Sequence, residues 1–288
     1  LTMANLKEIR TRITSVASTM QITSAMKMVS AAKLKRAQDA IIQMRPYAEK
    51  LHEILINLSA TLDDSSEGLY SQERDTQKVL LVAIASNRGL CGAFNANVFK
   101  KTEKRIKELS DLDVQVFPIG KRSVDYFTGK HTMFNSNLEV FNDLNFDSST
   151  LIAQEVMDAF VAGSFDKVEI IYNKFVNAAT QELMVEPFLP VQPEESEEVQ
   201  LNADYIFEPS KSSIVLDLIP KSLKIQFYKG LLDSHASEHG ARMTAMHKAT
   251  DNAQDLKDDL TLTYNRQRQA AITNEILEIV GGAEALKQ

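Results

Sequence analysis

The sequence lacks the features of a disulfide-bonded, secreted or membrane-spanning protein. It has one cysteine among 288 residues, Cys91, which excludes an internal disulfide and fits a reducing compartment. We interpret Cys91 as a small buried hydrophobic side chain rather than a nucleophile. The longest apolar run, Val79 to Ala85, is far shorter than the ~20 residues of a transmembrane helix. The first residues show no charged leader before an apolar stretch, so we expect no secretory signal and no membrane span.

Glycine and proline are missing from two long stretches. Neither occurs before Pro46, and neither occurs between Gly240 and Gly281. Within both stretches apolar side chains recur at spacings of three and four, which is the heptad pattern of a coiled-coil seam. The first seam consists of Leu6, Ile9, Ile13, Val16 and Met20, then Leu34, Ala37, Ile41, Met44, Ala48, Leu51, Leu55 and Leu58. The second consists of Met246, Ala249, Ala253, Leu256 and Leu260, then Ile272, Ile276, Ile279, Ala283 and Leu286.

These seams predict two long terminal helices that pair with each other. The two parts of the first seam share one phase, so a single helix is expected from about residue 5 to about residue 60, with a kink at Pro46. Such a helix is on the order of 80 Å long. Each seam must be covered, and the other terminal helix of the same chain is the nearest cover. We predict an intramolecular antiparallel coiled coil, with a parallel homodimer as the less economical alternative.

The first seam fails over residues 20–33. Its in-phase positions there are polar, and the apolar side chains Ile22, Met26 and Val29 lie off the seam. An apolar patch that faces away from the helical partner is a candidate contact with another protein. The alternative is a local stutter that repacks within the coil. The pattern alone does not separate these two interpretations.

The net charge of −7 conceals a basic N-terminal segment. Residues 1–50 hold nine Lys and Arg against three Asp and Glu, a net charge of +6, which leaves −13 for the remainder. A basic helix can meet nucleic acid, an anionic membrane surface or an acidic protein, and a solvated helix face is the default.

Between the terminal helices the pattern changes to short β-branched runs that alternate with helical stretches. We predict strands at 78–85, 114–117, 168–172 and 183–185, with helices at 95–109 and at 151–162, the latter capped by Asp147 or Ser148. This order predicts a Rossmann-like α/β domain with a mostly parallel sheet. The predicted organisation is an N-terminal coiled-coil helix (1–60), a central α/β domain (75–190), an acidic exposed excursion (191–209) and a C-terminal coiled-coil helix (210–288).

Two motifs resemble sites that carry chemistry. Gly89 and Gly92 follow the first strand, but their spacing differs from the dinucleotide fingerprint and no GxxxxGK(S/T) loop occurs, so we assign them to tight strand-to-helix packing. His235 and His239 fit the H-x-x-E-H pattern of some zinc peptidases. The match is short and lies on a long helix, so we interpret it as a solvated helix face rather than a metal site. We expect no catalytic residue, metal or cofactor.

A third motif interrupts the second seam with bulky polar side chains, from Tyr264 to Thr273. Arginine and glutamine offer directed hydrogen bonds, so Arg268 and Gln269 could hold loops of a partner. Surface solubility is the competing explanation.

Several separated motifs together resemble the gamma subunit of the F-type rotary ATP synthase. The segments Leu6 to Arg10 and Ile22 to Lys33 are similar to the opening helix of that family. Residues Ile272 to Ala285 satisfy its C-terminal signature, I-T-x-E-x-x-E-x-x-x-G-A-x-A. Arg88 to Gly92 with Phe94 and Asn95, and Ala236 to Glu238 with Ala241 to Met243, also fit. The resemblance extends over essentially the whole chain and suggests a bacterial member.

The resemblance implies a set of partner contacts. It places the coiled coil in a ring of alpha and beta subunits, with the patch Ile22, Met26 and Val29 where the shaft meets that ring. Arg268 and Gln269 match positions that hold a beta-subunit loop, and Lys33, Lys35 and Arg36 lie where acidic segments of beta approach. Tyr205, Phe207 and Glu208 match the foot that contacts the c-ring and epsilon, where the family often has a second tyrosine in place of Phe207.

The function implied by the resemblance is that of the central rotor stalk, a non-catalytic subunit. It couples rotation of the membrane c-ring to ATP synthesis or hydrolysis at the alpha/beta ring. The implied location is peripheral, at the cytoplasmic face of a bacterial plasma membrane, with no nucleic-acid partner. The competing hypotheses are a metal-dependent enzyme that uses His235 and His239, and a freestanding coiled-coil adaptor.

Overall fold

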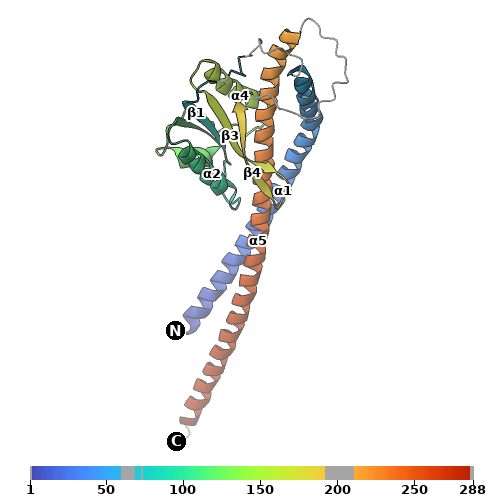
Figure 1. Cartoon of the computed structure of the whole chain (residues 1–288). Coiled ribbons are helices and arrows are strands. Elements are labelled where there is room, and N and C mark those ends of the chain that lie inside the picture. Colours follow the sequence, from blue (N-terminus) through green and yellow to red (C-terminus); the bar gives the residue numbers. More distant parts are fainter. Residues whose placement is uncertain (1, 60–68, 73, 192–210, 286–288) are drawn as a thin grey trace. The chain divides into compact units, whose positions relative to one another are not determined.

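The computed structural model describes residues 2–59, 69–72, 74–191 and 211–285 (Figure 1). The acidic excursion and the foot residues Tyr205, Phe207 and Glu208 lie outside these ranges. The elements are α1 (Thr2–Ser59), β1 (Lys78–Ile84), α2 (Phe94–Glu108), β2 (Asp113–Ile119), α3 (Lys121–Phe127), α4 (Phe146–Val161), β3 (Lys167–Phe175), β4 (Gln181–Leu189) and α5 (Lys211–Ala285).

The chain divides into two compact units, and both long helices contribute to each. The first unit joins the start of α1, up to Ser30, with the end of α5 from Met243 onward. The second unit contains Ala31–Arg242 and therefore includes the whole sheet. Helix α1 continues through Pro46, and α5 continues through Pro220.

The first unit is an antiparallel helix pair, as the seams predict. Thr23 of α1 and Thr250 of α5 form a hydrogen bond between the two helices, and Figure 1 shows them running in opposite directions. Ile9, Met246 and Ala253 are buried along the interface. Burial of the apolar stripe is the main source of stability for such a pair, because isolated helices are marginal in water.

The seam of α5 differs from the prediction in two places. Leu256 is 46% exposed, whereas the polar Lys257 is partly buried, so Leu256 was wrongly assigned to the seam. Beyond about residue 271 the seam has no cover within the described residues. Thr23 faces Thr250, so the described part of α1, which starts at Thr2, accompanies α5 for about the same number of residues past Thr250. Accordingly Ile272, Ile276 and Ile279 are exposed.

The second unit is built on a four-stranded sheet in the order β2-β1-β3-β4. β1 pairs in parallel with β2 and β3, and β4 adds to β3 in antiparallel orientation. The mostly parallel sheet is therefore confirmed. The burial of every residue from Val79 to Ala85 agrees with the apolar run of a central parallel strand.

Each face of the sheet carries its own hydrophobic core. On one face, Leu80, Val82 and Ile84 pack with side chains of α4 and α5, among them Val156, Phe160, Phe227 and Leu231. On the other face, Val79, Leu81 and Ala83 pack with Val98 of α2 and Phe127 of α3. Figure 1 shows α2 and α4 beside the sheet at different positions. Consecutive side chains of β1 enter the two cores in turn, because successive side chains of a strand point to opposite faces of the sheet.

Helix α4 begins earlier than predicted, and its cap is a different residue. The side chain of Asn145 accepts a hydrogen bond from the backbone N–H of Ser148, and the Ser148 hydroxyl completes a capping box. Asp147 lies in the first helical turn, where its negative charge interacts favourably with the helix dipole. The short helix α3 was not predicted, because seven residues are too few to show a helical period.

Candidate functional sites on the coiled coil and the central domain

Two of the three off-seam apolar residues of α1 lie on its exposed face. Ile22 is 60% exposed and Val29 is 58% exposed, and Met26 is partly buried. The in-phase polar residues Thr23 and Ser30 are buried instead. The coil does not repack around Ile22 and Val29. Their apolar side chains remain on the outer face of the helix pair.

The polar candidates on both long helices are exposed. Arg268 and Gln269 lie on the surface of α5, where the backbone carbonyl oxygen of Gln269 accepts a hydrogen bond from the hydroxyl of Thr273 at 2.9 Å. On α1, Lys33, Lys35 and Arg36 are exposed and flank Leu34 and Ala37, which are buried. Both sets present charge or hydrogen-bonding groups to the outside.

The H-x-x-E-H segment of α5 is not a solvated helix face, and that prediction was wrong. Glu238 and His239 are buried, and the ring of His235 stacks at 5.9 Å on that of Phe141. The reason is that this part of α5 lies in the second unit, against the central domain. The two histidine rings meet through their Nε2 atoms at 3.1 Å. Among the described residues, no group of three potential metal ligands gathers at this place or elsewhere.

Burial controls the protonation of this cluster. The pKa of His235 is lowered to about 4 by burial, with Lys33 and Arg242 acting in the same direction. The pKa of His239 is lowered to about 3 by burial, by His235 and by the same two cations. Both rings are therefore neutral at pH 7. Burial also raises the pKa of Glu238, and the nearby Arg242 offsets only part of that rise.

Arg242 joins this cluster to the turn that follows β1. Its Nη1 donates to Glu238 Oε1 at 2.6 Å, and its Nη2 donates to the carbonyl oxygens of Arg88 at 2.9 Å and Gly89 at 3.2 Å. A guanidinium suits this position because its planar fork can serve several acceptors at once. The turn and the polar segment of α5 thus meet in space, although they lie about 150 residues apart in the chain.

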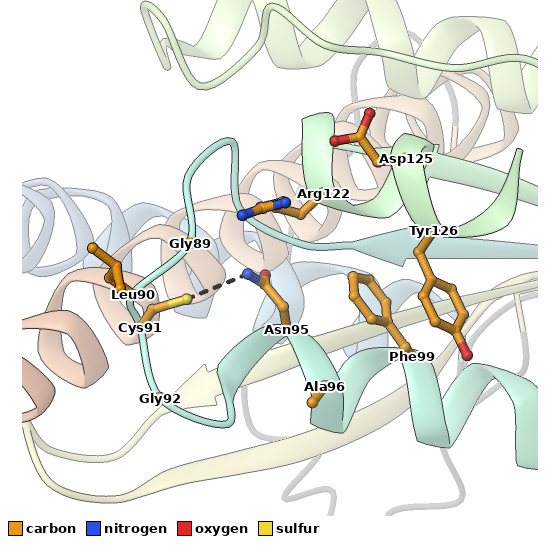
Figure 2. Close-up of a pocket in the computed structure, with 10 residues that line it drawn as sticks. All are labelled: Gly89, Leu90, Cys91, Gly92, Asn95, Ala96, Phe99, Arg122, Asp125 and Tyr126. Atoms are coloured by element: carbon orange, nitrogen blue, oxygen red, sulfur yellow. Dashed lines mark hydrogen bonds between the residues drawn. The ribbon is translucent and has the colours of Figure 1, made fainter.

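The turn after β1 has an unusual conformation. Leu90 has φ 61°, the left-handed region that side chains with a Cβ avoid, and its side chain is 65% exposed. Beside it, Cys91 is buried, as predicted, and its Sγ accepts a hydrogen bond from Asn95 Nδ2 at 3.3 Å (Figure 2). The Ser86 hydroxyl donates to the Arg88 carbonyl oxygen at 2.6 Å. Burial raises the pKa of the Cys91 thiol, which makes it a poor nucleophile.

The outer side of this turn borders a shallow hollow of about 430 Å³. Figure 2 shows the residues that line it, from the turn, from α2 and from α3. Phe99 and Tyr126 stack at 4.3 Å on one side, and Gly89 and Gly92 lie on the other. A Cβ at Gly89 would lie 2.9 Å from Nη2 of Arg122, the end of an exposed and flexible side chain that can move aside, so space does not require a glycine there. Gly92 has φ 60° and open space where a Cβ would stand, so it serves the backbone conformation of the turn, and the tight packing predicted for the two glycines is not found.

Comparison with known proteins decides the family. The sequence pattern of the family described as "ATP synthase" matches residues 5–286. The chain is 64% identical over 285 residues to the ATP synthase gamma chain of Flavobacterium psychrophilum, covering 99% of this chain and 100% of that protein. The chain belongs to the ATP synthase gamma chain family. The gamma chain of Geobacter sp. (strain M21) is 45% identical over 287 residues, again covering 99% of this chain and 100% of the relative.

Solved structures share the fold of this gamma chain. One is the Euglena gracilis mitochondrial ATP synthase in rotational state 3, with a TM-score of 0.70 and 20% identity, covering 98% of this chain and 95% of that chain. Another is the central stalk and c-ring of the Tetrahymena thermophila mitochondrial ATP synthase, with a TM-score of 0.60 and 24% identity, covering 79% and 99%. At these identities the likeness concerns the fold of the gamma chain.

Family membership confirms two functional predictions. The chain is a gamma chain, the central stalk subunit of the F-type ATP synthase, and it is a non-catalytic subunit. No described helix of this gamma chain combines the length and the apolar character that crossing a bilayer requires. Sequence reasoning missed the buried position of Arg242. The spacing of Glu238 and Arg242, one helical turn apart, was the signal that could have indicated it.

Proposed function

We propose that this chain is the shaft that couples rotation of a membrane c-ring to nucleotide chemistry in a surrounding ring of alpha and beta subunits. The observation that carries the proposal is the helix pair whose outer face displays Ile22 and Val29, in a chain related to gamma chains over its whole length. Exposed apolar side chains on a rod favour contact with a surrounding protein surface. No chemistry is required of the shaft itself.

The polar residues of the shaft would give direction to these contacts. Arg268 and Gln269 are exposed on α5 and can hydrogen-bond with a loop of the beta subunit. Lys33, Lys35 and Arg36 form an exposed basic group on α1 that would attract acidic segments of beta. A shaft that presents a different face to each beta subunit stabilises three unequal nucleotide sites, because each site then has its own contact energy.

A second group of contacts would attach the shaft to the membrane rotor. Tyr205, Phe207 and Glu208, which lie outside the described residues, would contact the c-ring and the epsilon subunit. In such an assembly the chain lies peripherally, at the cytoplasmic face of a bacterial plasma membrane. The relatives are bacterial gamma chains, which supports this location.

The proposal is tested by replacing Arg268 and Gln269 together with alanine in the assembled complex. We expect reduced ATP synthesis and reduced ATP-driven proton pumping per ATP hydrolysed, while the isolated variant unfolds at the same denaturant concentration as the parent. The matched control is Asp255→Ala with Asp259→Ala, an exposed pair four residues apart on the same helix. Parent-like synthesis in the Arg268 and Gln269 variant would contradict the role given to these residues.

The competing hypotheses predict different results on purification from native membranes. A rotor subunit co-purifies with alpha and beta subunits. A metal-dependent enzyme would retain stoichiometric zinc and show hydrolase activity alone, and an adaptor would bring unrelated partners. His239 is buried, His235 is half-buried, and both rings are neutral; with their contacts to Arg242 and Phe141, this argues for packing rather than catalysis.

A further inference from the structure

The turn from Ser86 to Gly92 adopts a conformation that its own residues do not favour. Leu90 has φ 61°, and a leucine in the left-handed region is strained because its Cβ approaches the following carbonyl oxygen. Its side chain is 65% exposed, so little packing on Leu90 compensates for this strain. The turn must therefore be stabilised from elsewhere.

The strongest external contact comes from Arg242. This side chain is buried, and three of its hydrogen bonds reach the carbonyl oxygens of Arg88 and Gly89, at 2.9, 3.2 and 3.3 Å. The two carbonyl groups immediately precede the strained residue. A charged donor makes such bonds stronger than neutral ones.

Glu238 holds the guanidinium in place. It is buried beside Arg242, and the two form an ion pair at 2.6 Å one helical turn apart on α5. The Nδ1 atom of His239 lies 3.4 Å from the same Nη1 atom. Because α5 is a continuous helix through these residues, the position of the fork is set by a rigid element rather than by a loop.

We propose that Arg242, fixed by Glu238, is a positioning residue that holds the Ser86–Gly92 turn closed against the strain at Leu90. The closed turn covers Cys91, which is buried although its neighbour Leu90 is exposed. The inference does not depend on the proposed rotor function, since every contact lies within the second compact unit of this chain.

Reaction of the Cys91 thiol measures the opening of the turn directly. Cys91 is the only cysteine in the sequence, and its buried thiol reacts with a reagent such as dithionitrobenzoate only when the turn opens. We expect Arg242→Met to raise the rate of labelling about tenfold or more in the absence of denaturant. Arg242→Lys, which keeps the charge but not the fork, should give an intermediate rate.

The direction of this change separates opening from a simple electrostatic effect. The positive charge of Arg242 lowers the pKa of Cys91. Removing that charge from a turn that stayed closed would leave less thiolate and slow the reaction. A faster reaction therefore reports opening.

The matched control is Arg105→Met. Arg105 also pairs with a buried carboxylate of the same compact unit, donating to both oxygens of Glu169 at 2.7 Å. Its remaining side-chain hydrogen bond goes to Glu108 on its own helix, away from the turn. This variant should lower the stability of the unit and leave Cys91 labelling within about twofold of the parent under native conditions.

Leu90→Gly provides the rescue. Glycine adopts positive φ readily, so the turn closes with less help. In the parent background Leu90→Gly should slow labelling, and in the Arg242→Met background it should restore a rate near that of the parent. Unchanged labelling in Arg242→Met, an equal rise in Arg105→Met, or no slowing by Leu90→Gly would each overturn the proposal. Because Leu90→Gly is measured in the otherwise intact chain, the proposal remains testable if Arg242→Met fails to fold.

Discussion

The hydroxyl oxygens of Thr23 and Thr250 lie 2.8 Å apart across the helix pair, and Thr23 stands at a position of the α1 seam where an apolar contact would be expected. Each hydroxyl also contacts its own helix, at the carbonyl oxygen of Met20 and of Met246 respectively. Polar residues at seam positions specify register at the expense of stability. We therefore expect the threonine pair to fix how α1 and α5 align.

Valine in place of threonine tests this pair, because the two side chains have the same shape. Thr23→Val or Thr250→Val alone should lower the free energy of unfolding by about 0.5–1.5 kcal/mol, since one hydroxyl loses its partner across the interface. The double variant should return to the parent stability or exceed it. Urea unfolding of the four proteins gives the coupling energy. Strict additivity of the two single effects would show that the hydrogen bond contributes nothing.

The exposed apolar patch of α1 should matter for assembly and not for folding. Ile22→Ser with Val29→Ser should change the free energy of unfolding of the isolated chain by no more than about 0.5 kcal/mol, because both side chains are already in water. Ile9→Ser, at a buried seam position, should lower it by about 2 kcal/mol or more. Denaturant unfolding compares the variants, and reconstitution with alpha and beta subunits then tests the patch. Normal assembly of the double variant would count against the proposed contact.

Two glycines with positive φ should respond differently to substitution. Gly120 has φ 89°, and a Cβ there would lie 2.1 Å from the carbonyl oxygen of Ala85. Gly129 has φ 76°, and a Cβ there would meet no atom within 4 Å among the described residues. Gly129→Ala should therefore lower the free energy of unfolding by about 1 kcal/mol, which is the cost of a positive φ for a residue with a Cβ. Gly120→Ala should cost several times as much, because the backbone of the turn after β1 must move. Equal losses in thermal unfolding would show that the close approach is relieved without strain.

Acid should weaken the central unit through its buried histidines. Below pH 6.5 the unfolded chain protonates His235 and His239, whereas in the folded chain their pKa values are about 4 and about 3. The unfolded state then binds more protons, so each histidine lowers the free energy of unfolding by about 1.2 kcal/mol between pH 6 and pH 5. Asp233 and Glu238 act in the opposite direction, because burial raises the pKa of both carboxyl groups, that of Asp233 to about 6.

The variant His239→Gln isolates this effect from those of Asp233 and Glu238, which both proteins share. Although less stable at pH 7, it should lose less stability than the parent from pH 6 to pH 5, by about 1.2 kcal/mol. Urea unfolding at both values measures the difference. Parallel pH dependence of the two proteins would mean that His239 is accessible to protons in the folded chain.

The sequence predicted those parts of the fold that follow from local periodicity. The heptads of α1 predict an apolar stripe that another helix covers, and the apolar run of β1 predicts a strand in the middle of a sheet. Leu256 shows the limit of this reasoning. Leu256 stands three residues after Ala253 and so fits the heptad spacing, yet Leu256 is exposed and Lys257 is the partly buried residue. The period of an α-helix differs slightly from that of the heptad, so a shift of one residue changes which side chain faces the partner.

The burial of polar residues was harder to foresee. His235, Glu238 and Arg242 have the composition of a solvated helix face, and the sequence alone favours that interpretation. Arg242 is buried against the carbonyl groups of a turn that is about 150 residues distant in the chain, and the half-buried His235 packs on Phe141. Such tertiary hydrogen bonds leave no local pattern. The off-seam position of Ile22, by contrast, was visible in the sequence because it departs from a regular seam.

The stretch of α5 beyond about residue 271 has a consequence for work with the purified chain. Its side chains Ile272, Ile276, Leu277, Ile279 and Val280 lie in water along a helix that has no partner there within the described residues. Contiguous apolar surface of this kind promotes self-association. Unfolding midpoints of the isolated chain should therefore shift with protein concentration, and dilution series are required before any of its stabilities are compared.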